Sequence, residues 1–126
     1  MPGIYVASRS RHAALWRAFR SDGYPIVSTW IDEAGRGETK DWRNLWKRCI
    51  REASEADVCV FYVEPGDFDG MTGALLEVGS ALGAGCPVLA VGPLEGSFQA
   101  HPLMTRFARL VEALDRAVGV IEVLSR

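Results

Sequence analysis

An α/β fold built on a doubly wound parallel sheet is the class that this sequence of 126 residues predicts. Apolar runs of strand length alternate along the chain with segments of helical period, and no repeat or low-complexity stretch interrupts them. One run, at residues 58–63, is apolar throughout, as a strand covered on both faces should be. Because each parallel crossover needs a covering helix, the alternation implies helices on both faces of the sheet. Residues 1–126 are expected to form a single domain of this kind.

The first half of the chain predicts two β-α units. Residues 3–7 form a short buried strand, residues 11–22 form a helix that stops at Gly23, and residues 25–29 form a second strand. A helix at residues 41–56 follows, because its apolar residues recur at steps of three and four: Trp42, Leu45, Trp46, Cys49, Ile50 and Ala53. We expect this stripe to face the sheet.

The second half of the chain predicts three more strands. After the strand at 58–63 comes a helix that contains Glu77, then a strand at 87–91, a helix from about 102 to 116 and a strand at 118–123. Five strands favour the spatial order 2-1-3-4-5. In that order the chain reverses direction between strands 1 and 3, and their carboxyl ends open a crevice where ligands of such sheets bind.

Composition excludes several classes of partner. A net charge of -2 and a pI near 5.7 give no general attraction to nucleic acid or to an anionic membrane. No apolar stretch approaches the ~20 residues that a bilayer requires, and the N-terminus does not resemble a signal peptide, so we expect a cytoplasmic protein. His12 and His101 lack the spacing of metal ligands and are expected at the surface or in loops, and neither a metal nor a cofactor is expected. The three cysteines have no CxxC spacing and are expected to be reduced, packed thiols: Cys49, Cys59 and Cys86.

Glu77 carries the clearest functional signal. It is the only charge in residues 71–84, a run that is otherwise made mostly of small and apolar residues. An ionised carboxylate is expensive to bury there, because it loses water that apolar neighbours cannot replace. Glu77 therefore marks a functional site, or else it pairs with an arginine or reaches the surface. Three glycines of this helix would each cost about 1 kcal/mol against alanine, which indicates that something approaches it closely: Gly73, Gly79 and Gly83.

The predicted crevice brings further candidates near Glu77. The segment Ser8-Arg9-Ser10-Arg11, after the first strand, should face residues 64–69, which follow the third strand. Free amides at the start of a helix suit a phosphate, although N-capping by a serine and solvated arginines explain the same residues. Asp67 and Asp69 are either site carboxylates or members of an ordinary turn. Tyr5 is either a core residue or a strand tyrosine whose hydroxyl enters the crevice.

Taken together, these residues resemble the nucleoside 2-deoxyribosyltransferase superfamily, including its branch of nucleoside 5'-monophosphate N-glycosidases. The resemblance covers about the whole chain and lies in Ile4-Tyr5-Val6-Ala7-Ser8-Arg9, Asp57-Val58, Gly73-x-x-x-Glu77-x-Gly79-x-Ala81, the strand at Pro87, and Gly92-Pro93-x-Glu95. It implies a flavodoxin-like sheet. It also implies cleavage of the N-glycosidic bond of a (deoxy)nucleoside or its 5'-monophosphate, with transfer of the sugar to another base or to water.

The resemblance implies roles for individual residues. Glu77 would be the nucleophile that attacks C1' of the sugar, and Asp67 or Asp69 would assist the departing base. Tyr5 would orient Glu77 or the sugar. The Ser8-Arg9-Ser10-Arg11 segment resembles the phosphate-gripping loops of the monophosphate hydrolase branch, which favours a nucleotide substrate.

One departure from the family leaves an alternative open. Members commonly carry an aspartate eight residues before the position of Asp57, and this chain has Cys49 there. Glu52 lies on nearly the same helical face and is the candidate substitute. A nucleotide-binding or sensing module that has lost turnover is therefore the alternative function.

The expected partners are a nucleoside or nucleotide and further copies of this chain. Members of the family often complete each pocket with a neighbour's residues, and a homodimer or larger homo-oligomer would bury some of the aromatic surface of residues 30–46. The alternative is that the tryptophans of this segment only cap the sheet.

Overall fold

The computed structural model describes residues 3–35 and 39–126. Within these ranges, no helix is both long enough and apolar enough to cross a bilayer. The elements follow one another as β1 (Ile4–Ala7), η1 (Ser10–His12), α1 (Ala13–Ser21), η2 (Thr29–Asp32), α2 (Trp42–Glu55), β2 (Val58–Tyr62), α3 (Gly73–Gly83), β3 (Val88–Val91), η3 (Ser97–Ala100), β4 (Met104–Phe107) and α4 (Leu110–Leu124).

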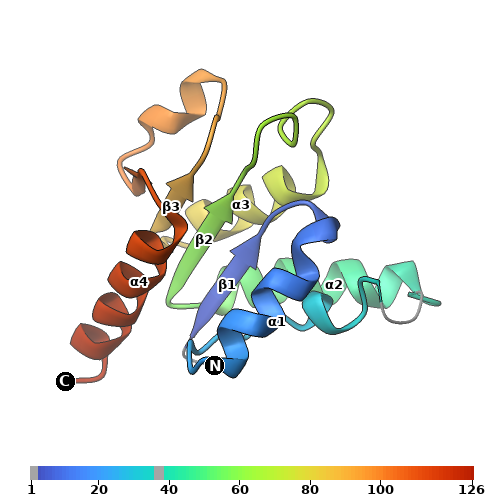
Figure 1. Ribbon diagram of the computed structural model, residues 1–126, viewed down its shortest axis with the longest axis horizontal. Helices are drawn as coiled ribbons and strands as arrows, with labels where there is room; N and C mark the ends of the chain where they lie inside the picture. Colours follow the sequence, from blue (N-terminus) through green and yellow to red (C-terminus); the bar gives the residue numbers. More distant parts are fainter. Residues whose placement is uncertain (1–2, 36–38) are drawn as a thin grey trace.

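The described strands form one parallel sheet in the order β1-β2-β3-β4. In its centre, Val60 of β2 lies beside Val6 of β1 and Leu89 of β3. Figure 1 shows α1 and α4 in front of the sheet, with α2 and α3 behind it. Helices α2 and α3 pack on each other, and α4 packs on β2 and β3. The predicted α/β class, with helices on both faces of a parallel sheet, is confirmed.

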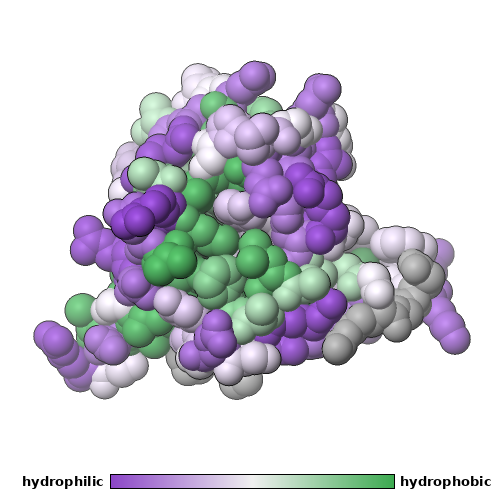
Figure 2. Space-filling view, in the orientation of Figure 1, coloured by the Kyte–Doolittle hydropathy of each residue, from purple (hydrophilic) through white to green (hydrophobic). Residues whose placement is uncertain are grey.

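The core lies along β1, β2 and β3. Every residue of β1 and β3 is buried, as are the first four residues of β2. In front of the sheet, Trp16 of α1 is fully buried, and Figure 2 shows an apolar area between α4 and α1 surrounded by hydrophilic side chains. Behind the sheet, α2 begins at Asp41, whose carboxylate accepts hydrogen bonds from the amides of Arg43 and Asn44.

The strand predicted at residues 25–29 is reduced to a single parallel bridge between Ile4 and Ile26. Two side chains replace the ladder beyond that point. The hydroxyl of Ser28 accepts a hydrogen bond from the amide of Val6 (2.7 Å), and the indole of Trp30 donates to the carbonyl of Val6 (2.9 Å). Because the backbone groups of Val6 are already satisfied, the chain turns into η2 instead of pairing further.

The helix predicted from about 102 to 116 and the strand predicted at 118–123 are wrong. Residues 104–107 form the edge strand β4, and residues 110–124 form one helix. Only one residue of β4 is buried, so its sequence lacks the apolar run of an inner strand. The later apolar residues follow a helical step instead, with Ala113, Leu114 and Ala117 buried on one face of α4. In the described residues the sheet therefore has four strands, not five, and the order 2-1-3-4-5 is not confirmed.

Candidate functional site

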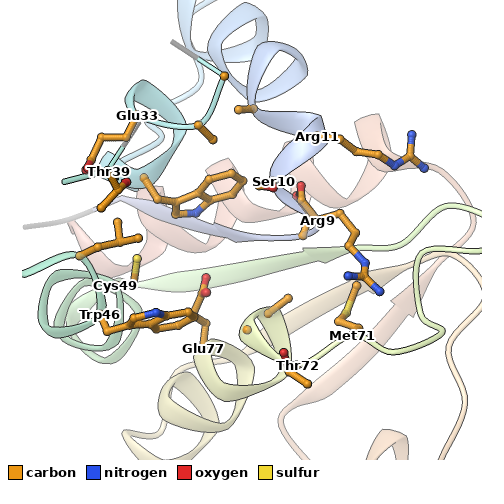
Figure 3. Close-up of a pocket in the computed structure, with 18 of the residues that line it drawn as sticks. Arg9, Ser10, Arg11, Glu33, Thr39, Trp46, Cys49, Met71, Thr72 and Glu77 are labelled. Carbon is orange, nitrogen blue, oxygen red and sulfur yellow. Dashed lines mark hydrogen bonds between the residues drawn. The ribbon is translucent and has the colours of Figure 1, made fainter. Parts of the chain in front are cut away.

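A cavity of about 670 Å³ opens beside the carboxyl end of β1. Its walls come from the segment after β1, the start of α1, η2 and the residues that follow it, one face of α2, and the first turns of α3. Figure 3 shows residues from all of these segments directed toward one space. The volume lies within the range of about 300–1,000 Å³ that is usual for small-molecule sites. The cavity is thus a candidate binding site at the edge of the sheet where the sequence predicted a crevice.

Glu77 lies in this cavity, one turn into α3. Its exposed fraction is 7%, and the hydroxyl of Tyr5 donates a 2.6 Å hydrogen bond to its Oε1 atom. Burial raises the pKa of Glu77 to about 7, although the hydrogen bond from Tyr5 acts in the opposite direction. No cation pairs with this carboxylate among the described residues. The side chain can therefore change its charge near neutral pH.

Tyr5 and Cys49 complete the surroundings of this carboxylate. Tyr5 is fully buried in β1, and burial together with the charge of Glu77 raises its pKa far above the ordinary value. The phenol thus stays protonated and can only donate to Glu77. Cys49 of α2 lines the cavity, and burial followed by the charge of Glu77 raises its pKa to about 12. A neutral thiol therefore occupies the position where the family resemblance implied an acid.

Asp67 lies outside the cavity, in a buried cluster behind the loop that follows β2. Its carboxylate accepts hydrogen bonds from Arg11 (2.6 and 3.0 Å) and from the amide of Glu64 (2.9 Å), and it contacts Nε2 of His12 at 2.6 Å. Burial alone would raise the pKa of Asp67. These partners outweigh burial and lower that pKa to about 2. Asp69 is exposed and does not line the cavity either.

The predicted phosphate segment does line the cavity. Arg9 reaches across the crevice and donates to the carbonyls of Asp67 (2.8 Å) and Asp69 (2.5 Å). In the described part of the chain no carboxylate pairs with Arg9, whereas Arg11 pairs with both Glu64 and Asp67. Ser10 is exposed at the start of η1, and the hydroxyl of Ser8 accepts a hydrogen bond from Trp16. Arg9 therefore supplies positive charge to this end of the cavity.

His12 is buried, and the expectation that it lies at the surface or in a loop is wrong. Its ring contacts Tyr62 edge-on, with the ring centroids 5.1 Å apart. Together with Glu64 and Asp67 it brings three potential metal-ligand atoms within 4.8 Å of one another. The guanidinium of Arg11 already pairs with both carboxylates, and its charge opposes a cation. The arrangement suits a clamp that joins η1 to the loop after β2.

Gly73 is close to another group, as predicted. A Cβ atom at this position would lie 2.9 Å from the Trp46 ring, so the indole packs on the bare backbone of α3. Gly79 and Gly83 have no such neighbour within 4 Å among the described residues. Trp46 thereby forms part of the cavity wall next to Glu77 (Figure 3).

Sequence reasoning missed Glu33 and Thr39, which line the cavity from the segment after η2. The signal was present, because these residues follow the predicted second strand and the carboxyl ends of parallel strands meet at one edge of a sheet. Glu52, the candidate substitute for the missing family aspartate, does not line the cavity. Its carboxylate accepts hydrogen bonds from the amide and hydroxyl of Thr29 (2.9 and 2.8 Å).

Comparisons with known proteins agree with the fold. No protein-family model matches the chain, and no curated protein matches it. Among solved structures, the chain is similar to a 2-deoxyribosyltransferase from the psychrotolerant bacterium Bacillus psychrosaccharolyticus, described as a biocatalyst for the synthesis of nucleosides. The similarity has a TM-score of 0.65, covers 91% of each chain and has 16% sequence identity. At 16% identity the likeness shows the fold. The shared fold agrees with the resemblance that the sequence motifs indicated.

Proposed function

We propose that this protein cleaves the N-glycosidic bond of a (deoxy)nucleoside or nucleoside 5'-monophosphate, with Glu77 as the nucleophile. The observation that carries the proposal is the buried carboxylate of Glu77 in a cavity of ligand size, bonded by the hydroxyl of Tyr5 and paired with no cation of the described residues. The likeness to a 2-deoxyribosyltransferase supports the same chemistry.

The reaction would proceed in two displacements at C1' of the sugar. As the bond from C1' to the base nitrogen breaks, its electron pair leaves with the base, and the ring gains oxocarbenium character. The ionised Glu77 stabilises this charge and forms an ester bond to C1'. A second nucleobase, or water, then attacks C1' and breaks the ester bond, which releases the carboxylate of Glu77. The attacking group loses its proton to solvent or to a neighbouring proton acceptor. Transfer and hydrolysis differ only in this acceptor.

Tyr5 would set the state of the nucleophile. Its hydroxyl bonds one oxygen of Glu77, which leaves the second oxygen for the sugar carbon. The same bond favours the ionised carboxylate that nucleophilic attack requires, against the effect of burial. Asp67 is engaged by Arg11 and His12 outside the cavity, so in this proposal it holds the loop rather than protonating the base.

A 5'-monophosphate is the substrate form that the electrostatics favour. The guanidinium of Arg9 lines the cavity, and its partners among the described residues are backbone carbonyls, so its charge is available to an anion. The exposed hydroxyl of Ser10 and the start of η1 lie beside it. A phosphate near these groups would lie within the cavity that also contains Glu77, as the cleavage of a bound nucleotide requires (Figure 3).

The test is chromatographic detection of free base from nucleosides, deoxynucleosides and their 5'-monophosphates, with and without a second base. Glu77→Gln should lower release by about 10³-fold or more while leaving ligand binding within a few-fold. The control Glu112→Gln, which changes an exposed carboxylate on α4, should leave release unchanged. The exchanged or hydrolysed product would separate transferase from hydrolase.

The second candidate is a nucleotide-binding or sensing module, which the neutral thiol of Cys49 at a commonly acidic position favours. In such a module, no substrate would release base, a nucleotide would still raise the melting temperature, and Glu77→Gln would alter its affinity. Absence of release from every substrate, together with that thermal shift, would overturn the enzyme proposal.

A further inference from the structure

A second polar group lines the cavity, away from Arg9. Glu33 and Thr39 follow η2, and the hydroxyl of Thr39 donates to Oε1 of Glu33 at 3.1 Å. Figure 3 shows this pair at one end of the cavity, Arg9 and Arg11 at the other, and Glu77 between them in this view. The carboxylate of Glu33 thus lies at a different part of the cavity wall from Arg9.

Glu33 is held in place from behind by Arg48 of α2. The two side chains form an ion pair with 2.5 Å between Nη2 and Oε2. Arg48 is itself fixed by hydrogen bonds to Asn44 (3.1 Å) and to the hydroxyl of Thr29 (2.7 Å), and it does not line the cavity. The carboxylate of Glu33 is therefore oriented by Arg48 and Thr39 before any ligand binds.

We infer that Glu33 determines which base is accepted, by receiving hydrogen bonds from adjacent N–H groups on the edge of the base. The inference rests on the proposed function for the sugar and the leaving group. A carboxylate that is paired with an arginine accepts hydrogen bonds, and each oxygen of Glu33 keeps a free lone pair after bonding Thr39 or Arg48. A base that presents two neighbouring donors completes this set.

Guanine fits that requirement among the common bases. Its ring N1–H and its exocyclic 2-amino group are adjacent donors on one edge. Hypoxanthine lacks the amino group, adenine and cytosine offer one amino group beside an acceptor nitrogen, and thymine and uracil surround their single N–H with carbonyl oxygens. Those oxygens would face the carboxylate, so thymine and uracil are the bases that Glu33 disfavours most.

The aromatic side chains of α2 suit a planar ligand at this end. Trp42 and Trp46 lie one turn apart and both line the cavity, and Trp42 is 63% exposed. Base stacking on indole rings tolerates any base. Stacking would therefore hold the base, and the hydrogen bonds to Glu33 would select it.

Two measurements test this inference: kcat/KM for base release, and affinity by calorimetry. Both are made with dGMP, dIMP, dAMP, dCMP and dTMP. The proteins compared are wild type, Glu33→Gln, Glu33→Asp and the control Glu112→Gln. Wild type should prefer dGMP to dIMP by about 10-fold or more, because only dGMP has the amino group. Glu33→Gln should lower kcat/KM and affinity for dGMP about 10- to 100-fold, and it should leave both quantities for dTMP unchanged or improved. Glu33→Asp should weaken the preference although the charge is kept, and Glu112→Gln should preserve it.

The outcomes separate this inference from the proposed function. The inference is overturned if base is released but wild type prefers dTMP, or if Glu33→Gln lowers kcat/KM for all five substrates by one common factor. The proposal that the protein is an enzyme is supported in either case. If no base is released but calorimetry detects a dGMP preference that Glu33→Gln removes, the enzyme proposal fails and the base-reading role of Glu33 is supported. Equal affinities for all five nucleotides in wild type, without release, would overturn both.

Discussion

Two buried carboxylates, Glu77 inside the cavity and Asp67 outside it, have pKa values that move in opposite directions. The exposed fraction of Asp67 is 4% and that of Glu77 is 7%, so both side chains are nearly closed to solvent. The pKa of Asp67 falls to about 2, whereas that of Glu77 rises to about 7. Asp67 has Arg11, His12 and a backbone amide as partners, and Glu77 has the single hydroxyl of Tyr5.

The difference teaches that the partners of a carboxylate, weighed against its burial, decide what the group can do. A group with several donors and a cation is fixed in its charged state and stabilises the fold. A group with one neutral donor in an open cavity stays chemically available, at a cost in stability. We therefore interpret Asp67 as a structural clamp and Glu77 as the reactive group.

The largest expected effect comes from breaking the clamp. Asp67→Ala should lower the free energy of unfolding by about 3 kcal/mol, because it leaves His12 and the amide of Glu64 buried without their partner. The matched control Glu112→Ala removes an exposed carboxylate paired with Arg109 and should change stability by less than about 0.5 kcal/mol. Urea unfolding at pH 7 measures both. Equal effects of the two variants would contradict the assignment of Asp67.

The dependence of stability on pH should separate the two carboxylates. The folded-state pKa of Glu77, about 7, lies above its ordinary value of 4.5, so its contribution to stability is full below about pH 4.5 and is lost as pH rises toward 7. At roughly 1.4 kcal/mol per pKa unit, the loss is about 3 kcal/mol. Glu77→Gln should remove it and become more stable than wild type at pH 8.

Asp67 should show the opposite sign. Its folded-state pKa of about 2 lies below the ordinary 3.8, so its contribution is present above about pH 4 and is lost as pH falls toward 2. Asp67→Asn should flatten this acid limb, and Glu77→Gln should not. Urea unfolding across pH 2–8 measures both curves. A Glu77→Gln variant that is less stable than wild type at pH 8 would show that the carboxylate has a stabilising partner after all.

The smallest expected effect comes from the hydroxyl of Tyr5. Tyr5→Phe removes the only described hydrogen bond that favours ionised Glu77, so the pKa of Glu77 should rise further and the acid limb of kcat/KM should move up by about one pH unit. The control Tyr24→Phe removes a hydroxyl at the same distance, 2.6 Å, from an exposed carboxylate, Asp115. Its pH profile should match that of wild type. Identical profiles for all three proteins would exclude Tyr5 from setting the state of Glu77.

The inner part of the fold followed from sequence because it repeats one pattern. Strands β1, β2 and β3 are apolar runs buried on both faces, and α2 has an apolar stripe with an N-capping aspartate. The edges did not follow. Strand β4 buries one residue, and the bridge at Ile26 ends where Ser28 and Trp30 satisfy Val6, so neither edge leaves a periodic signal.

The candidate site divided in the same way. Glu77 was found because a lone charge in an apolar segment is costly wherever it is placed, and Arg9 because it directly follows a strand. Asp67 was expected in the crevice and lies outside the cavity, whereas Glu33 was not named and lines it. Both are acidic residues in polar loops, and nothing in those loops says which of them faces the cavity. Arg11 and His12 draw Asp67 away from the cavity, and Arg48 fixes Glu33 at its wall.

Sequence by itself determined the α/β class, the crevice at the carboxyl end of the first strand, and Glu77 as its charged residue, because apolar periodicity and the cost of a buried charge are local properties of the chain. Tertiary structure alone decided which acids are paired and which remain available. Partners such as Tyr5 for Glu77 and Arg11 for Asp67 are more than fifty residues away along the chain. Charge state depends on distances between such atoms, and only the folded chain fixes those distances.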